Sequence, residues 1–174
     1  MSSEPPKRPV VLIFMGVAGS GKTTVAKLFA DKTGAIFHEG DDCHPPENIA
    51  KMSAETPLTD ADRAAWLAAL HKIVARALAT NTFSVLTCSA LKAKYRDELQ
   101  GSDPRVRFVH LTGARAVIEA RLKGRSGHFM PAALLDSQFA ILEPPADAWT
   151  FSVEKPPEAI VAELIQVLDS MRTA

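Results

Sequence analysis

Short, mainly apolar segments recur five times along the chain. The segment 10–15 is continuously apolar and rich in β-branched side chains, including Val10, Val11 and Ile13. A run of this kind is typical of a strand that is buried on both faces of a parallel sheet. We predict strands at residues 10–15, 35–38, 84–88, 106–111 and 149–153.

Between these segments, apolar residues recur every three or four positions, which is the spacing of one helix face. The longest such stretch follows Thr59, a residue suited to helix capping. Trp66, Leu67 and Leu70 lie on its apolar face, and we assign them to the core. Helices are predicted at residues 22–33, from Thr59 to at least 78, at 92–100, 114–123 and 131–142, and from Pro157 to 171. The stretch 41–51 begins as a loop and has room for a short helix.

This alternation predicts one α/β domain over residues 1–174, with a five-stranded, mainly parallel sheet between two helical layers. A chain of 174 residues falls within the usual range of one domain and can bury a core without disulfides. Its two cysteines, Cys43 and Cys88, are too few for a disulfide scaffold. They favour reduced thiols, and therefore a cytoplasmic location.

The charges balance, because 20 Lys and Arg residues stand against 20 Asp and Glu residues. We therefore expect no nucleic acid bound through bulk positive charge and no membrane surface as partner. Lys7 and Arg8, followed by the apolar run, resemble a signal peptide, but the run is too short to span a bilayer. Residues 1–9 contain three prolines and are expected to form a flexible tail.

A glycine-rich motif lies between the first predicted strand and the first predicted helix. Its residues are Gly16, Val17, Ala18, Gly19, Ser20, Gly21, Lys22 and Thr23, followed by Thr24. The motif matches the full GxxxxGK[ST] pattern of a P-loop. Glycines let main-chain N–H groups approach phosphate oxygens, and the helix N-terminus adds positive potential. Lys22 can reach the outer phosphates and Thr23 can bind magnesium, so the motif predicts a site for a nucleoside triphosphate with Mg²⁺.

Acidic residues follow the second predicted strand, at the sheet edge where such folds bind ligands. Asp41 is a candidate base for the proton of an attacking hydroxyl. Glu39, two residues earlier, is a candidate for holding magnesium through water. A turn with solvated carboxylates explains the same pattern. The lack of an NKxD motif argues against a switch GTPase, and the length argues against a motor.

Several further blocks make a family recognisable. They are His44-Pro45, Cys88-Ser89-Ala90-Leu91-Lys92 with Tyr95-Arg96, and Gly127-His128-Phe129-Met130-Pro131 with Ser137-Gln138-Phe139. Together with the P-loop, they resemble the bacterial-type gluconokinases, small kinases that phosphorylate D-gluconate at its 6-hydroxyl. The resemblance implies a three-layer α/β/α P-loop kinase fold with a mobile lid. It also implies ATP and Mg²⁺ as cofactors, D-gluconate as substrate and a cytoplasmic homodimer.

The resemblance implies a substrate pocket as well. Gluconate carries a carboxylate and several hydroxyls, so its pocket needs cations and hydrogen-bonding groups. The cationic candidates are Arg63, Lys92 and Arg96. The candidates for the acceptor hydroxyls are His44, His128 and Gln138. A solvated helix face is the alternative for Lys92, Arg96 and Gln138, and a surface or structural position is the alternative for the two histidines.

Arg121 and Arg125 are four residues apart, on one face of a predicted helix. They lead into a polar break at about 124–131, which the resemblance identifies as the lid. Lid arginines in small P-loop kinases neutralise charge in the transition state, so Arg121 and Arg125 join Asp41 and Lys22 as catalytic candidates. An ordinary basic helix end is the alternative.

Three positions depart from the family pattern. Glu55 stands where glycine is usual, and its carboxylate is expected near the acceptor pocket. Cys43 replaces a common leucine, and Ala18 replaces a frequent serine. Two other functions stay open: a kinase of the same fold that acts on shikimate or a nucleotide, and a regulatory nucleotide-binding protein without catalysis.

Overall fold

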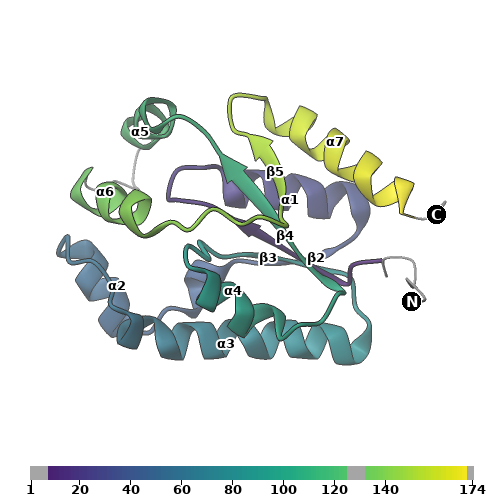
Figure 1. Cartoon of the computed structure of the whole chain (residues 1–174), viewed down its shortest axis with the longest axis horizontal. Helices are drawn as coiled ribbons and strands as arrows, with labels where there is room; N and C mark the ends of the chain where they lie inside the picture. Colours follow the sequence, from purple (N-terminus) through teal and green to yellow (C-terminus); the bar gives the residue numbers. More distant parts are fainter. Residues whose placement is uncertain (1–7, 125–131, 172–174) are drawn as a thin grey trace.

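The computed structural model describes residues 8–124 and 132–171 (Figure 1). Within them, five parallel strands form one sheet in the order β2-β3-β1-β4-β5. The strands are β1 (Val11–Met15), β2 (Ile36–His38), β3 (Ser84–Thr87), β4 (Val106–Thr112) and β5 (Trp149–Ser152). The central strand β1 is fully buried and pairs with β3 and β4, as its continuous apolar run predicts.

Helices cover both faces of the sheet. They are α1 (Lys22–Thr33), α2 (Pro46–Ser53), α3 (Asp60–Thr80), α4 (Ala93–Gln100), α5 (Arg115–Lys123), α6 (Ala132–Ile141) and α7 (Pro157–Ser170). Helices α1 and α7 lie over one face, and α3 and α4 lie over the other (Figure 1). Each pair buries an apolar cluster against the sheet. The predicted three-layer α/β/α architecture is therefore confirmed.

The predicted elements agree with the structure to within one or two residues at most ends. Thr59 caps α3 as predicted, and Asp62 completes a reciprocal capping box with it. The stretch 41–51 resolves into a short 3₁₀ helix, η1 (Gly40–Cys43), followed by α2. Lys92 precedes α4 as its N-cap residue, whereas the sequence placed it inside the helix.

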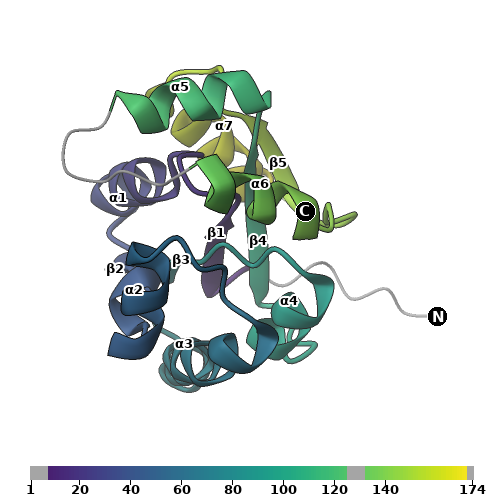
Figure 2. The same cartoon turned by 90° about the vertical axis from the view of Figure 1, so that its left-hand side faces the viewer.

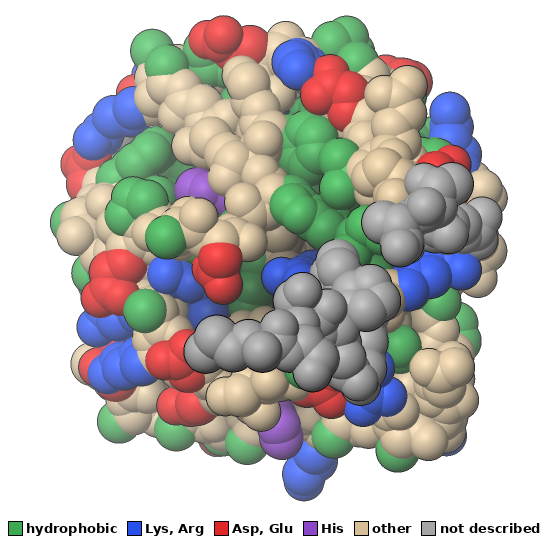
Figure 3. Space-filling model, turned by 45° about the vertical axis from the view of Figure 1, so that its right-hand side comes forward, with side chains coloured by type: hydrophobic (Ala, Val, Ile, Leu, Met, Phe, Trp, Pro, Cys, Tyr) green, Lys and Arg blue, Asp and Glu red, His purple; other side chains and the backbone are tan. Residues whose placement is uncertain are grey.

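The surface agrees with the balanced composition. On the face shown in Figure 3, acidic and basic side chains are interspersed with apolar and uncharged ones. None of the described helices combines the length and the apolar character needed to cross a bilayer.

Glu55 adopts a left-handed backbone conformation with φ of 60° just after α2. This conformation costs a residue with a Cβ atom about 1–2 kcal/mol, which explains why glycine suits the position. We expect Glu55→Gly to raise the free energy of unfolding by up to about 1 kcal/mol, because the backbone entropy of glycine offsets part of the gain. Urea denaturation of the purified variant measures the change. Glu55→Ala keeps the Cβ, so an equal gain in that variant would implicate the charge instead.

Candidate active site

The P-loop turns from β1 into α1 at the carboxyl end of the sheet. Gly16 approaches the main chain of β4 so closely that a Cβ would lie 2.5 Å from the carbonyl oxygen of Leu111. Gly21 precedes α1 with φ of 88° and provides no side-chain cap for the first amides of the helix. Lys22 Nζ donates to the carbonyl oxygens of Gly16 and Val17 at 3.0 and 3.1 Å. The loop thus has the glycine geometry and the lysine placement of a phosphate site.

Glu39 connects the ends of three elements. Thr23 Oγ1, at the start of α1, donates to Glu39 Oε2 at 2.6 Å. Thr87 Oγ1, at the end of β3, donates to Glu39 Oε1. These hydroxyl and carboxylate oxygens form a donor set that suits a hard cation such as Mg²⁺, which also keeps water and phosphate ligands. The structure therefore brings Thr23 and Glu39 together, as the sequence predicted for a magnesium site.

Asp41 lies in η1, on a segment that buried groups hold in place. Trp66 Nε1 donates to the carbonyl oxygen of Gly40 at 2.8 Å. The imidazole of His44 stacks on the Trp66 ring, with centroids 4.2 Å apart and planes 13° apart. Trp66 is buried, as predicted, but its hydrogen bond and ring contact also position the segment that carries Asp41. The pattern that predicted its burial could not reveal this second role.

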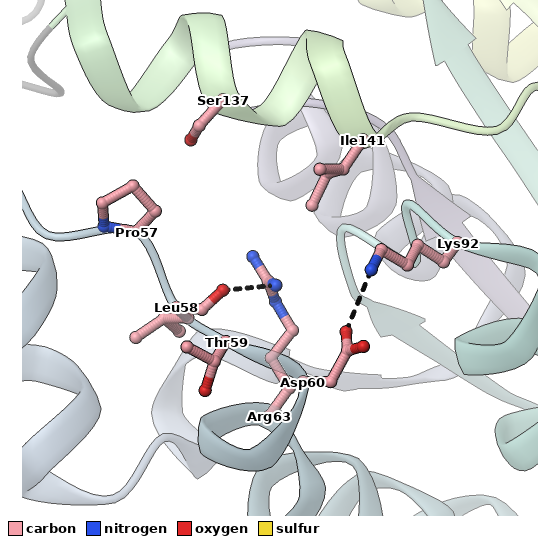
Figure 4. Close-up of a pocket in the computed structure, with 8 residues that line it drawn as sticks. All are labelled: Pro57, Leu58, Thr59, Asp60, Arg63, Lys92, Ser137 and Ile141. Carbon is pink, nitrogen blue, oxygen red and sulfur yellow. Dashed lines mark hydrogen bonds and ion pairs between the residues drawn. The ribbon is translucent and has the colours of Figure 1, made fainter.

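A pocket of about 170 Å³ opens between α3, α6 and the residue before α4 (Figure 4). Its lining residues are Pro57, Leu58, Thr59, Asp60, Arg63, Lys92, Ser137 and Ile141. Arg63 is buried, and its guanidinium lies in the middle of the group in Figure 4. Nη1 of Arg63 donates to the carbonyl oxygen of Leu58 at 2.7 Å and to Tyr95 Oη at 3.3 Å. Two of the three predicted cations, Arg63 and Lys92, therefore line one pocket.

Asp60 lines the pocket but is not among the site residues predicted from the sequence. Its carboxylate accepts a hydrogen bond from Tyr95 Oη and forms ion pairs with Lys94 and Lys92, the latter at 3.1 Å. Hydrogen bonds from Lys94, Tyr95 and Lys92 hold the pKa of Asp60 well below its usual range. Beyond its place in the blocks that resemble the gluconokinases, Asp60 carried only the signal of a helix first turn. Its partners come from 32 to 35 residues away, so no local pattern identifies it.

The P-loop and the segment that carries Asp41 both contact the chain at the end of β3, beside the buried Cys88. Burial is the main factor that raises the pKa of Cys88 to about 12. Charges of Lys22, Asp41 and Arg63 also act on this thiol. Independently of these charges, the main-chain N–H of Gly16 donates to the carbonyl oxygen of Ser89 at 3.3 Å, and that of Gly40 donates to Thr87 Oγ1 at 3.0 Å. Helices α2, α5 and α6 lie around the same end of the sheet (Figure 2).

Gln138 contacts the P-loop in this structure. Its Oε1 accepts a hydrogen bond from the main-chain N–H of Ala18 at 2.7 Å. The sequence placed Gln138 near the acceptor or on a helix surface, and gave no sign of this contact across 120 residues. Glu55 is exposed and does not line the pocket, so the expected extra carboxylate is not found there.

Arg96 departs from the expectation of a solvated helix face. Its side chain is only 8% exposed, so it does not lie on a solvated helix face. Nη1 donates to the carbonyl oxygens of Ala90 and Leu91 at 2.8 and 3.3 Å, and Nη2 donates to that of Glu143 at 2.9 Å. These contacts fix the loop after β3 to the segment after α6. These contacts give the guanidinium a structural role, and its contact with substrate stays a prediction.

The lid candidates are only partly covered by the described residues. Arg121 lies in α5, as predicted, and its Nη2 donates to the carbonyl oxygen of Val153 just after β5. Gly124 follows the end of α5. Arg125 and His128, with the rest of the predicted lid, lie outside the described residues.

Comparison with known proteins identifies the family. A family model described as an AAA domain matches residues 11–145. The gluconokinase of Gluconobacter oxydans is 48% identical, with 91% of each chain covered. The solved gluconokinase of Sinorhizobium meliloti 1021 is 43% identical with a TM-score of 0.83, covering 95% of this chain and 94% of that one.

More distant structures share the fold alone. A shikimate kinase of Aquifex aeolicus superposes with a TM-score of 0.60 at 18% identity, covering 94% of this chain and 99% of that one. This likeness agrees with the P-loop kinase topology described above. The sequence identity to the two gluconokinases, 48% and 43%, is more than twice as high and extends over nearly the whole chain. The chain belongs to the gluconokinase family.

Proposed function

We propose that this protein transfers the γ-phosphoryl group of ATP to the 6-hydroxyl of D-gluconate, giving 6-phospho-D-gluconate and ADP. The observation that carries the proposal is that the P-loop and the segment of Asp41 are both hydrogen-bonded to the end of β3, while α3, whose Trp66 holds Gly40, brings Arg63 into the pocket. A phosphate loop, a carboxylate and a cation-lined pocket at one point are what transfer to an acidic polyol requires. Family membership favours gluconate over shikimate, nucleotide or purely regulatory alternatives.

The P-loop residues 16–24 bind the triphosphate through their main-chain N–H groups, and Lys22 moves from its loop carbonyls to the outer phosphates. Thr23, directly, and Glu39, through water, are the residues that hold Mg²⁺. Magnesium supplies charge neutralisation at the phosphates when it is bound. Asp41 orients the 6-hydroxyl and accepts its proton as the oxygen attacks the γ-phosphorus in line. Arg121 and Arg125 act from the lid on the developing charge.

The acceptor lies in the pocket between α3 and α6. Arg63 binds the gluconate carboxylate, since its guanidinium matches two carboxylate oxygens, and Lys92 adds a second charge. Asp60 accepts hydrogen bonds from substrate hydroxyls. His44 and His128 form hydrogen bonds with other hydroxyls of the substrate. Gln138 completes the site from α6, where it accepts the hydrogen bond from Ala18 of the P-loop. A homodimer in the cytoplasm is the assembly and location that the resemblance favours.

Coupled ADP release tests this function. Wells with Mg-ATP receive D-gluconate, shikimate, AMP or no acceptor. We expect release with D-gluconate alone. ADP release with another acceptor would overturn the pocket assignment. If no well released ADP although a thermal-shift assay showed ATP binding, the regulatory alternative would be supported.

Two lysines that pair with the same carboxylate give a matched comparison within this assay. Lys92 lines the pocket, whereas Lys94 does not, and both form ion pairs with Asp60. We expect Lys92→Met to raise the KM for gluconate at least about tenfold, the value of one charge-assisted contact, with little change in the KM for ATP. Lys94→Met should change either KM by less than about threefold. Equal effects of the two variants would remove Lys92 from the binding site.

A further inference from the structure

Asn48 is a buried polar residue whose amide orientation is fixed by its surroundings. Its side chain is 2% exposed, and Nδ2 lies 2.9 Å from the main-chain carbonyl oxygen of Asp62. A carbonyl oxygen can only accept, so the atom that faces it must be the NH₂ group of Asn48. The two ends of the amide are thereby distinguished by chemistry.

The same NH₂ group determines the protonation of His44. Asn48 Nδ2 also lies 3.3 Å from His44 Nδ1. Because Nδ2 is a donor, Nδ1 must be an acceptor and carries no proton. Burial lowers the pKa of His44, which favours the neutral ring, while Asp41 acts in the opposite direction and Arg63 adds to the lowering. A neutral imidazole with a bare Nδ1 carries its proton on Nε2.

The ring is also fixed in space. It stacks on Trp66, whose indole N–H holds the carbonyl oxygen of Gly40, the residue before Asp41. Among residues 8–124 and 132–171, no group accepts a hydrogen bond from His44 Nε2. An oriented N–H donor is therefore held beside the segment that carries the candidate base.

We propose that Asn48 is a positioning residue that fixes His44 as the Nε2–H tautomer, so that His44 donates a hydrogen bond to an oxygen of the phosphoryl acceptor. The proposal rests on the function proposed above. It assigns opposite roles to the side chains of His44 and Asp41. His44 donates to a lone pair of an acceptor oxygen, whereas Asp41 takes the proton of the attacking hydroxyl. His44 does not compete with Asp41 as a second base, because the lone pair on its unprotonated Nδ1 accepts the hydrogen bond from Asn48.

Nitrogen-15 NMR of the imidazole rings tests the tautomer without any activity measurement. Two-bond ¹H–¹⁵N spectra of the labelled wild-type protein at pH 7.5 distinguish Nε2–H, Nδ1–H and imidazolium rings. The His44 signals are identified by their loss in His44→Gln. We expect the Nε2–H pattern. An Nδ1–H ring or an imidazolium would overturn the proposal, whether or not gluconate is the substrate.

Variants test the link to Asn48 and the donor role. Asn48→Asp offers His44 Nδ1 an acceptor in place of a donor, so His44 should become Nδ1–H or imidazolium. Asn81→Asp, at the exposed end of α3, should leave the His44 spectrum unchanged.

His44→Gln keeps an N–H donor at the Nε2 end and should retain kcat/KM within about tenfold. His44→Phe keeps the stacking alone and should lose about a hundredfold or more of kcat/KM. Equal losses in the Gln and Phe variants would overturn the donor role, and unaltered His44 signals in folded Asn48→Asp would overturn the role of Asn48.

Discussion

Replacement of Asp41 by asparagine should leave the protein folded and remove most of its turnover. The carboxylate lies in η1, two residues after Glu39, which binds Thr23 at the end of the P-loop, and a hydroxyl that attacks the γ-phosphoryl group must lose its proton. Asparagine keeps the shape of the side chain but cannot accept that proton. Loss of a positioned general base typically costs about 10²–10⁴-fold in rate. Measurement of kcat with saturating ATP and gluconate, alongside thermal unfolding, checks the expectation.

The neighbouring residue provides the control for this variant. Asp42 lies in the same short helix, is exposed, and has no assigned role in the reaction. Asp42→Asn removes the same charge and should keep kcat within about threefold of the wild type. A near wild-type kcat in Asp41→Asn would exclude Asp41 as the base. A raised KM with unchanged kcat would instead assign it to acceptor binding.

Gly40→Ala should disrupt the site by a purely steric route. A Cβ at this position would lie 1.8 Å from the carbonyl oxygen of Thr87, a main-chain atom of β3 that cannot rotate away. The segment must therefore move, which breaks the Trp66 bond to Gly40 and displaces Asp41. We expect a loss of about 3 kcal/mol or more in the free energy of unfolding, together with a large loss of kcat. Urea denaturation and steady-state kinetics measure the two effects.

Gly124 offers the matched glycine-to-alanine change for the stability measurement. Its φ is −79°, and the nearest atom to an added Cβ lies at 3.6 Å, which is ordinary contact. Gly124→Ala should leave the free energy of unfolding unchanged or raise it by about 0.4–1 kcal/mol. If Gly40→Ala were as stable and as active as the wild type, the close packing of η1 against β3 would be contradicted.

Most of the fold could be predicted because its signals are local. The apolar run of β1, the glycines of the P-loop and the capping residue Thr59 each specify structure within a few residues. The strand order could not be obtained in this way. It depends on which strands meet across the sheet, as when Val11 pairs with both Ser84 and Val106.

The site was predictable where residue type alone restricts the chemistry. Lys22 and Thr23 follow from the P-loop motif, whereas Arg63 became a candidate through the resemblance to the gluconokinases. Side chains whose contacts depend on distant partners could not be placed from local patterns. Asp60 acts through partners on α4, and Arg96 is buried among main-chain carbonyls although its sequence neighbours are polar.

The contacts of Arg96 bear on how this chain can vary in evolution. The guanidinium binds the main-chain oxygens of Ala90, Leu91 and Glu143, and every amino acid supplies such an oxygen. Substitutions at those three positions can therefore accumulate without removing an acceptor. Arg96 itself has no such freedom, because lysine cannot span three separated carbonyls with one ammonium group. We therefore expect Ala90, Leu91 and Glu143 to be replaced among related sequences while Arg96 is retained.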